Sequence, residues 1–490
     1  MALTPYQEHH LKPTFERLGR WLFHPMVEAS LAHVVMLAER GILDEAQARR
    51  LCQALVGLRA VQAETLAYTP DVEDIYFWIE RALAHEVGPE VAADLQRARS
   101  RNDLDAAVFR MLLRTDLIHL IQTMARTGVA LARQAHAMSD VVIVGYTHRQ
   151  PAQPTTVGHV LAGYGEALLT QARTLAGVLP VINRSPLGAC AFAGTDFPID
   201  RNRVAELLGF SGLVHSTYES VAGADHFGLV AGGVATALSG GARFCRTLLD
   251  WLGVDKGWLT LPDAFVQVSS IMPQKRNPVV LEHLVALAGD AVGLATAVLV
   301  KSQDSFYEDT DIGTSDVQLN VRESLAIAQR FYQLLGELIA VLRVGRVPAE
   351  AEMIGQYVTT TQVADTLTAL GLPFRQAHSV VSRLVKSGKT PSAWRAADLQ
   401  EACQAVTGHA LEAAPEELEA RLREALNPFR VLERATPGGP GRQAVRELAT
   451  ELEAAFTDLA GRMDQEQERL TQSRRLLDQA LRELGVRLEA

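Results

Sequence analysis

Apolar side chains recur along most of this 490-residue chain with the spacing of α-helices rather than that of strands. Across residues 28–66 the apolar positions follow a helical period, and the sequence predicts that Gly41 ends one helix and Asp44 begins the next. Residues 141–146, with the sequence VVIVGY, form the only obvious β-branched run. The pattern therefore predicts an all-α fold.

Three segments are apolar around most of the helix circumference, at residues 157–176, 229–249 and 281–301. Helices of this kind normally lie buried in a bundle. The third segment contains Glu282, His283 and Asp290, so it lacks the run of about 18 uncharged residues that a membrane span requires. We therefore expect a helical bundle and no membrane association.

The spacing of these helices suggests three helical domains. Residues 1–100 contain short helices, residues 101–347 contain the long apolar helices of a central bundle, and residues 348–490 contain shorter, more charged helices. This length is too great for one core and fits about three domains. We take these ranges as the predicted domain boundaries.

The amino-acid composition indicates which binding partners and which cellular compartment to expect. The chain has 57 Asp and Glu residues against 47 Lys and Arg residues and shows no dense basic block, so nucleic acid is not an expected partner. The cysteines lack the spacing of metal ligands, and the first 20 residues lack the apolar core of a signal peptide. We expect a cytoplasmic protein with reduced thiols and no metal site.

Three polar loops stand out against the helical pattern: ARSRNDLD at residues 98–105, GYTHRQPAQPTTVGH at 145–159 and SSIMPQKRNP at 269–278. Each has a plain structural interpretation. Asn102 or Asp103 could cap a helix, His148 could be structural, and Ser, Pro and Asn are ordinary loop formers.

Taken together, the three loops contain the chemical groups that one type of reaction needs. His148 and Ser269 can handle protons, and Glu282 could orient a histidine. Groups suited to holding carboxylates are also present: Arg101, Asn102, Lys275 and Asn277. This set suits removal of a proton α to a carboxylate, because cations and amides can stabilise the resulting aci-carboxylate. Loss of an amine or hydroxyl from the neighbouring carbon would then give an alkene acid, and no cofactor is required.

SSIMPQKRNP closely resembles GSSxMPxKxNP, the signature of the fumarase/aspartase superfamily. Further motifs resemble those of its argininosuccinate lyase branch and occur in that branch's order, from about residue 25 to residue 445. They are RSRND, GYTHRQPAQP, SPLGACAFAGTDFPIDR, LLGF, GLPFRQAH and TPGG.

The resemblance implies a homotetramer in which the central domains form one large bundle and three chains share each active site. It implies that Ser269 is the catalytic base, that Lys275 contributes to catalysis, and that His148 pairs with Glu282. It implies fumarate as a product and no cofactor. The substrate-binding residues that it implies are Ser100, Arg101, Asn102, Thr147, Gln150, Met272, Asn277 and Tyr307.

The chain departs from the branch pattern at several positions. Val268 replaces a glycine, Tyr76 a histidine, Leu104 a glutamine and Arg149 a leucine. The segment at residues 305–316 keeps Tyr307 but supplies neither the Gln nor the Lys that usually help to hold argininosuccinate. These departures affect recognition of the leaving amine and leave the elimination groups in place.

We therefore predict a carbon–nitrogen lyase that eliminates an amine from an N-substituted aspartate and releases fumarate reversibly, by a serine-base anti-elimination. The substrate could be an aminocarboxylate of the ethylenediamine-disuccinate type. One alternative is a genuine argininosuccinate lyase, and another is an inactive structural or binding paralogue. Hydration of fumarate fits less well, because the companion motifs belong to the carbon–nitrogen lyase branch.

Overall fold

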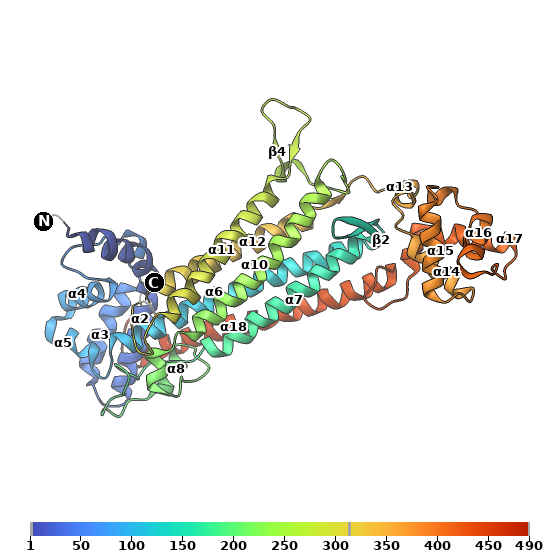
Figure 1. The fold of residues 1–490 in the computed structure, drawn as a ribbon. Helices are drawn as coiled ribbons and strands as arrows, with labels where there is room; N and C mark the ends of the chain where they lie inside the picture. The colour runs from blue at the N-terminus through green and yellow to red at the C-terminus, as the bar shows by residue number, and fades with distance from the viewer. Residues whose placement is uncertain (1–2, 312–314, 489–490) are drawn as a thin grey trace.

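The computed structural model describes residues 3–311 and 315–488. In this part of the chain, long helices run side by side along the middle of the molecule, and strands occur only as short pairs (Figure 1). The helices before residue 100 lie at one end of the bundle, and the helices α13 to α17 lie at the other end. The prediction of a helical fold built on a central bundle is confirmed.

The long helices of the bundle are α6 (Arg101–Ala137), α7 (Val157–Ile182), α10 (Asp225–Leu252), α11 (Val279–Gln303), α12 (Ser315–Ala340) and α18 (Arg442–Glu483). Helix α6 contacts α7, α12 and α18, while α10 contacts α7, α11 and α12. Gly128 allows α6 and α18 to approach closely, because a Cβ at this position would lie 2.3 Å from ring atoms of Phe456. The short helices α8 (Arg201–Leu207) and α9 (Thr217–Ala222) connect α7 to α10.

The N-terminal end is formed by α1 (Lys12–Thr14), α2 (Arg20–Glu39), α3 (Glu45–Leu58), α4 (Ile75–Val87) and α5 (Pro89–Ala93). Two π-helical turns, Gln7–Leu11 and Phe15–Gly19, flank α1. Gly41 has a positive φ of 64° just after α2, and the Asp44 carboxylate accepts the N–H groups of Ala46 and Gln47 at the start of α3. Both helix boundaries predicted here are confirmed.

The opposite end is a small domain of short helices with an apolar core of its own. The helices are α13 (Glu350–Gly355), α14 (Thr360–Ala369), α15 (Phe374–Lys386), α16 (Ala396–Thr407) and α17 (Pro415–Leu426). Leu367, Leu399 and Leu422 are buried in this core, and Trp394 is fully buried beside them. The apolar faces of α14 to α17 are therefore covered within the domain itself, whereas Met353 of α13 belongs to the core of the bundle.

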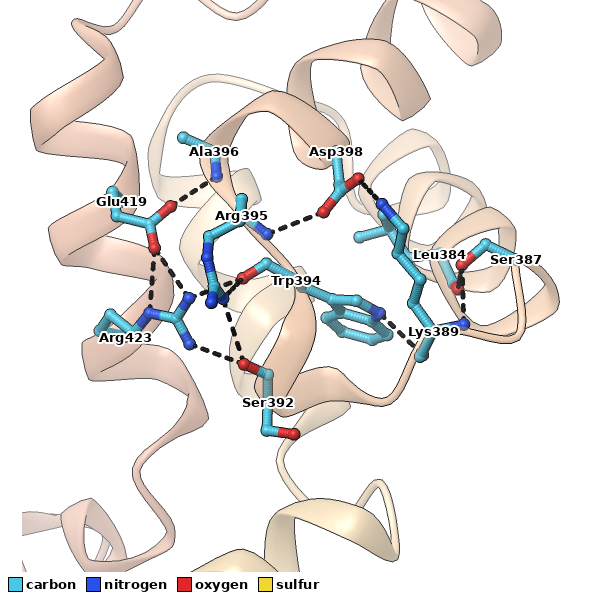
Figure 2. Close-up of polar contacts among 10 residues, drawn as sticks. All are labelled: Leu384, Ser387, Lys389, Ser392, Trp394, Arg395, Ala396, Asp398, Glu419 and Arg423. Atoms are coloured by element: carbon cyan, nitrogen blue, oxygen red, sulfur yellow. Dashed lines mark hydrogen bonds and ion pairs between the residues drawn. The ribbon is translucent and has the colours of Figure 1, made fainter.

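Hydrogen bonds and ion pairs hold the loop that precedes α16 in place (Figure 2). The Trp394 indole N–H donates to the Lys389 carbonyl oxygen at 3.1 Å. Glu419, on α17, accepts the Ala396 N–H at 2.6 Å, and Arg423 donates to the Trp394 carbonyl oxygen at 2.8 Å. Helix α17 thus pairs the Ala396 N–H, which has no intrahelical partner at the start of α16, and also the Trp394 carbonyl oxygen just before the helix.

Helix α18 follows the small domain in sequence but packs in the bundle and ends near the N-terminal helices (Figure 1). Its Phe456 and Leu459 are buried in the same core as α6, and Asp478 pairs with Arg59 of the N-terminal region at 2.7 Å. The sequence-based division placed all of residues 348–490 in one C-terminal domain. The structure divides this stretch instead, because α6 and α7 bury the apolar face of α18.

Short antiparallel strand pairs hold several connections. β1 (Val142–Thr147) pairs with β2 (Gln150–Thr156), β3 (Leu259–Thr260) with β6 (Arg343–Val344), and β4 (Gln267–Val268) with β5 (Arg276–Asn277). The first pair contains the β-branched run seen in the sequence. The two-residue strands of the other pairs are too short to produce a recognisable period.

Two stretches of the described residues are long and apolar enough to cross a membrane, judged by length and composition alone: Gln7–Glu39 and Val279–Gln303. Most of the first, 72% of its apolar window, is buried within the chain, whereas only 28% of the corresponding window of α11 is buried. Leu299 and Val300 of α11 are about half exposed. Helix α11 therefore presents an apolar surface that a single chain does not cover.

Candidate active site

The predicted site residues lie in three groups, each at an end of a bundle helix (Figure 1). The first group is at the start of α6, next to the N-terminal helices. The second is on the β1–β2 hairpin, which follows the other end of α6. The third is the loop between β4 and β5 together with the start of α11.

Ser100 is the residue that caps α6. Its hydroxyl accepts the Asn102 N–H at 3.4 Å, and the Asp103 carboxylate returns to accept the Ser100 N–H at 3.0 Å. The expectation that Asn102 or Asp103 would be the cap was wrong, because a Ser/Asp capping box begins the helix at Arg101. Asp103 also accepts the N–H groups of Gly188 and Cys190, so it joins the SPLGAC loop to this end of the helix.

Arg101 is surrounded by acidic and aromatic groups. It forms an ion pair with Asp74 and lies 3.8 Å from the carboxylate of Asp105. Its guanidinium carbon lies 5.3 Å from the ring centre of Tyr76 and 5.4 Å from that of Phe77. Arg101 is thus already paired with carboxylates of its own chain, where the sequence suggested a group that holds a substrate carboxylate.

Two departures from the branch pattern are packing positions. Leu104 is 1% exposed and Tyr76 is 4% exposed. The Tyr76 hydroxyl donates to Glu80 at 2.6 Å and accepts from Gln96, so it is fully engaged within the chain. Burial raises its pKa, and the hydrogen bond to Glu80 raises it further. Neither side chain has the exposure that direct contact with a substrate needs.

A cavity of about 300 Å³ opens beside Arg101 and Asn102. The N-terminal segment forms one wall through Tyr6, His10 and Thr14. Carboxylates dominate the remaining polar lining: Glu73, Asp74, Asp105, Asp309, Asp311 and Asp316. Burial and the neighbouring Asp74, Asp309 and Asp311 raise the pKa of Asp105 to about 7, against the opposing effect of Arg101.

Tyr307 lies near this end of the bundle but does not line the cavity among its described residues. Its hydroxyl donates to Glu219 at 2.5 Å, and its carbonyl oxygen accepts the Tyr218 hydroxyl at 2.9 Å. The side chain is 65% exposed. Residues 312–314 of the segment in which Gln and Lys are missing lie outside the described residues.

The second group lies on the β1–β2 hairpin. Its two-residue turn is His148 and Arg149, both with positive φ, 50° and 64°, between the paired Thr147 and Gln150. This geometry is that of the tight turns that match the twist of two strands. Thr147, His148 and Gln150 are exposed, and the first two line a cavity of about 760 Å³.

Arg149 anchors this turn to the end of α10. Its guanidinium donates to both carboxylate oxygens of Asp250, at 3.1 and 3.3 Å. Lys256 also pairs with Asp250, and its ammonium lies 4.0 Å from the ring centre of Tyr146. Burial alone would raise the pKa of Asp250, but the hydrogen bonds from Arg149 and Lys256 hold it below its ordinary value. Arg149 therefore has a carboxylate partner within its own chain.

The third group lies on the serine loop, residues 269–277, which projects from the bundle (Figure 1). The hydroxyl oxygen of Ser269 accepts the backbone N–H of Met272 at 3.1 Å and that of Ile271 at 3.4 Å. The base of the loop is held by β4 and β5, in which Val268 pairs with Arg276. Val268 does not have positive φ, so this backbone does not need the glycine of the usual signature.

Lys275 and Met272 are exposed on the serine loop, and Asn277 is half-buried at its end. Lys275 makes no ion pair within the described ranges 3–311 and 315–488. By contrast, the neighbouring Arg276 pairs with Asp263. Lys275 is thus the cation of this loop that remains available to an anionic ligand.

A single chain does not bring these groups together. Helix α6 has 37 residues, which at about 1.5 Å per residue separates the Arg101 group from the hairpin by about 55 Å. Helix α11 has 25 residues and separates Glu282, in its first turn, from the Tyr307 region by about 38 Å. No hydrogen bond joins His148 to Glu282 in the part of the chain that the structure describes. The predicted pairing of these two residues therefore remains a prediction.

The acidic lining beside Arg101 was missed in the sequence. Asp105 lies four residues after Arg101 on α6, a spacing that places both on one helix face. Asp309 and Asp311 come from the segment after α11, and only the fold brings them to the same cavity. Within the described residues, no group of three or more His, Cys, Asp or Glu side chains is arranged to hold a metal ion.

Comparison with known families agrees with the motif pattern. The family described as "Lyase" matches residues 17–293, and the family described as "Argininosuccinate lyase C-terminal" matches residues 357–433. Argininosuccinate lyase 2 of Agrobacterium fabrum is 35% identical over 385 residues, which cover 78% of this chain and 76% of the relative. The argininosuccinate lyase of Methanosarcina mazei is 30% identical over 450 residues, or 90% of each chain.

Solved structures extend the similarity to nearly the whole chain. EDDS lyase in complex with formate superposes with a TM-score of 0.85 at 29% identity, covering 99% of this chain and 96% of that one. A variant of EDDS lyase has been solved with bound fumarate. A class II fumarase from Schistosoma mansoni superposes with a TM-score of 0.68 at 14% identity, covering 84% of this chain and 90% of its own, and shares the fold alone.

Proposed function

Because the chain belongs to the argininosuccinate lyase branch of the fumarase/aspartase superfamily, and is thus a carbon–nitrogen lyase that releases fumarate, we propose that its substrate is an N-substituted aspartate other than argininosuccinate. The leaving group is the substituted amine. The observation that carries this proposal is the combination of an intact serine loop with altered amine-recognition segments. Each part of the proposal has its own physical basis.

Ser269 is assigned as the base that removes a proton from the Cβ of the substrate. A serine hydroxyl ordinarily holds its proton far too tightly for this task. Here its oxygen accepts the N–H groups of Ile271 and Met272, and hydrogen bonds to the charged form favour an alkoxide. The loop thus supplies two of the donors that a serine base requires.

Proton removal leaves an aci-carboxylate at the β-carboxyl group, which carries two negative charges. Lys275 and Asn277, on the same loop, can stabilise this charge as it develops. The electron pair then forms the carbon–carbon double bond while the Cα–N bond breaks. The departing nitrogen takes a proton, and fumarate and the free amine remain. We assign Thr147 and His148 to the carboxylate contacts and proton handling that accompany this step.

We propose that a complete site requires three copies of the chain in a homotetramer. The length of α6 places the Arg101 group about 55 Å from the hairpin, and the length of α11 places Glu282 about 38 Å from the Tyr307 region. Packing of α11 against other copies would cover its apolar surface and would bring the ends of different chains together. In this arrangement Glu282 of one copy would reach His148 of another.

The proposed substrate follows from the residues that are expected to bind the leaving amine. The Gln and Lys expected to hold the distal end of argininosuccinate are missing from the segment that contains Tyr307. A site that leaves polar substrate groups unpaired loses several factors of ten in discrimination. Similarity to EDDS lyase over 99% of this chain supports a different aspartate adduct. Argininosuccinate itself is the second candidate, favoured by identities of 30 to 35% to argininosuccinate lyases.

The reaction is tested by the ultraviolet absorbance of fumarate when candidate substrates are added. Ser269→Ala should lower the rate by at least about a hundredfold, because a positioned base is lost, while thermal unfolding stays unchanged. Near-normal turnover by this variant would exclude Ser269 as the base. Absence of fumarate from every substrate would favour the inactive paralogue.

The substrate is tested by kcat/KM for argininosuccinate beside a panel of aspartate–amine adducts that includes ethylenediamine disuccinate. We expect at least one adduct to exceed argininosuccinate by about tenfold or more. A value for argininosuccinate far above the whole panel would identify an ordinary argininosuccinate lyase.

A further inference from the structure

The cavity beside Arg101 has more negative charge than its own chain balances. Arg101 is the one Arg or Lys side chain among the described residues that line it, and this guanidinium is already paired with Asp74. Asp105 lies 3.8 Å from Arg101, and its second carboxylate oxygen is buried without a hydrogen-bond partner among the described residues. Glu73, Asp309, Asp311 and Asp316 add further carboxylates to the lining.

The titration behaviour of these groups agrees with their crowding. The pKa of Asp105 rises to about 7 because the group is buried, and Asp74, Asp309 and Asp311 add to this effect. The pKa of Asp309 is also raised, by partial burial and by Asp311. Both pKa values are raised first by burial, the neighbouring carboxylates add to this effect, and Arg101 opposes it. A cation placed among them would remove the like-charge repulsion.

We infer that this cavity receives the leaving amine and selects one that carries a second, cationic nitrogen, as a small diamine does. The inference rests on the proposed function, since it concerns the substrate of the same elimination. It assigns Asp105 and Asp309 as specificity-determining residues, with Asp311 beside them.

The two halves of the substrate have opposite charges, and this difference sets their orientation. The aspartate half carries two carboxylates, which the acidic cavity would repel and which Lys275 and Asn277 of the serine loop suit. The amine half is the part that can be positively charged. A volume of about 300 Å³ is at the lower limit of small-molecule sites, so the amine must be short.

The test compares three substrates of nearly equal size, N-(2-aminoethyl)aspartate, N-propylaspartate and N-(carboxymethyl)aspartate. Their amine arms end in a cationic, a neutral and an anionic group. We expect kcat/KM to be about tenfold or more higher for the cationic arm than for the neutral one, and lowest for the anionic arm. The preference should shrink as salt concentration rises, because the interaction is electrostatic.

Substitutions of the cavity carboxylates test whether these residues cause the preference for a cationic amine. Asp105→Asn and Asp309→Asn should each lower the ratio of kcat/KM for the cationic substrate to kcat/KM for N-propylaspartate by about three- to tenfold. Asp365→Asn, the same change at an exposed position of α14, is the matched control and should leave this ratio unchanged. Asp309 lies in the segment that connects α11 to α12 and not in the core, so its variant remains informative if Asp105→Asn fails to fold.

The outcomes separate this inference from the proposed function. Fumarate released equally from the cationic and neutral substrates, or faster from the anionic one, would overturn the inference and leave the lyase assignment in place. A cationic preference that both Asp variants retain would also overturn it, because the selecting groups would lie elsewhere. No fumarate from any of the substrates would contradict the proposed function itself.

Discussion

The small domain of α13 to α17 and the bundle helix α11 differ in how they treat their apolar side chains. The small domain encloses its own core around Trp394 and satisfies the start of α16 with contacts from α17 (Figure 2). Helix α11 is more apolar but has only 28% of its central window buried within the chain. Its polar end carries Glu282 next to the serine loop, and no hydrogen bond joins Glu282 to His148 within the described residues.

This difference indicates which of the two regions should affect stability and which should affect function. A region whose faces are all covered by its own residues can be stable in a single chain. In the assembly that we propose, other copies of the chain cover the apolar surface of α11 and complete the reactive loops. We therefore expect substitutions in the small domain to change stability, and substitutions on α11 or the site loops to change assembly and activity.

The largest effect should come from the core of the small domain. Trp394→Ala should lower the free energy of unfolding by about 3–5 kcal/mol, because it leaves a large cavity and removes the hydrogen bond to Lys389. Denaturant unfolding at fixed protein concentration measures this loss. Trp394→Phe, which keeps an aromatic ring, should cost less. Loss of fumarate release by a variant that remains folded would show that this domain contributes to the chemistry.

The next effect concerns the apolar surface of α11. The double variant Leu299→Glu, Val300→Glu should dissociate the proposed tetramer and lower fumarate release by at least about a hundredfold, because separated chains would not complete the proposed shared site. Sedimentation velocity reports the assembly. Val254→Glu is the matched control, since Val254 is 97% exposed outside the bundle core. An active monomer would contradict both the assembly and the shared site.

A third prediction uses mixtures of inactive chains. Ser269→Ala and His148→Ala chains, refolded together, should recover up to about a quarter of wild-type activity, because hybrid tetramers contain some sites with both residues intact. Ser269→Ala mixed with Lys275→Ala should recover none, since both residues lie on one loop and enter a site from the same copy. Equal recovery in the two mixtures would argue against sites shared in this way.

The smallest predicted effect is the pH dependence from Asp105. Its pKa in the folded chain, about 7, is above the ordinary value of 3.8, so the folded state holds this proton more tightly than the unfolded state. The resulting contribution to stability is complete below about pH 4 and is lost as pH rises to about 7.

Asp105→Asn should remove this dependence. The free energy of unfolding of the variant should equal that of the natural protein at pH 4 and exceed it by about 2 kcal/mol at pH 8. A difference of one pKa unit corresponds to about 1.36 kcal/mol, and the expected gain is reduced because solvent screens a partly exposed carboxylate. Denaturant unfolding at the two pH values, with Asp365→Asn as the control, measures the difference. A stability difference that is the same at both pH values would show that Asp105 does not titrate as its surroundings predict.

Sequence reasoning recovered the features that depend on neighbouring residues. The ends of α2 and α3 follow from Gly41 and Asp44, which act on backbone groups within one turn. The serine loop was found because its reactive residues are contiguous. Leu104 and Tyr76 were taken as positions that could affect substrate choice, and the structure places both in the core. Their burial depends on packing against helices that are distant in sequence. A local sequence pattern gives no information about that packing.

The sequence by itself determined the helical character, the helix boundaries at Gly41 and Asp44, and the chemical groups that each loop offers, because hydrogen bonding and side-chain periodicity act over a few residues. Only the tertiary structure decided that α18 returns to the bundle, that Arg101 is paired with Asp74, and that Asp105 and Asp309 line one cavity. These facts depend on which distant surfaces bury one another. That selection is made by the packing of the whole chain, since many helices of similar amphipathic pattern could cover the same apolar face.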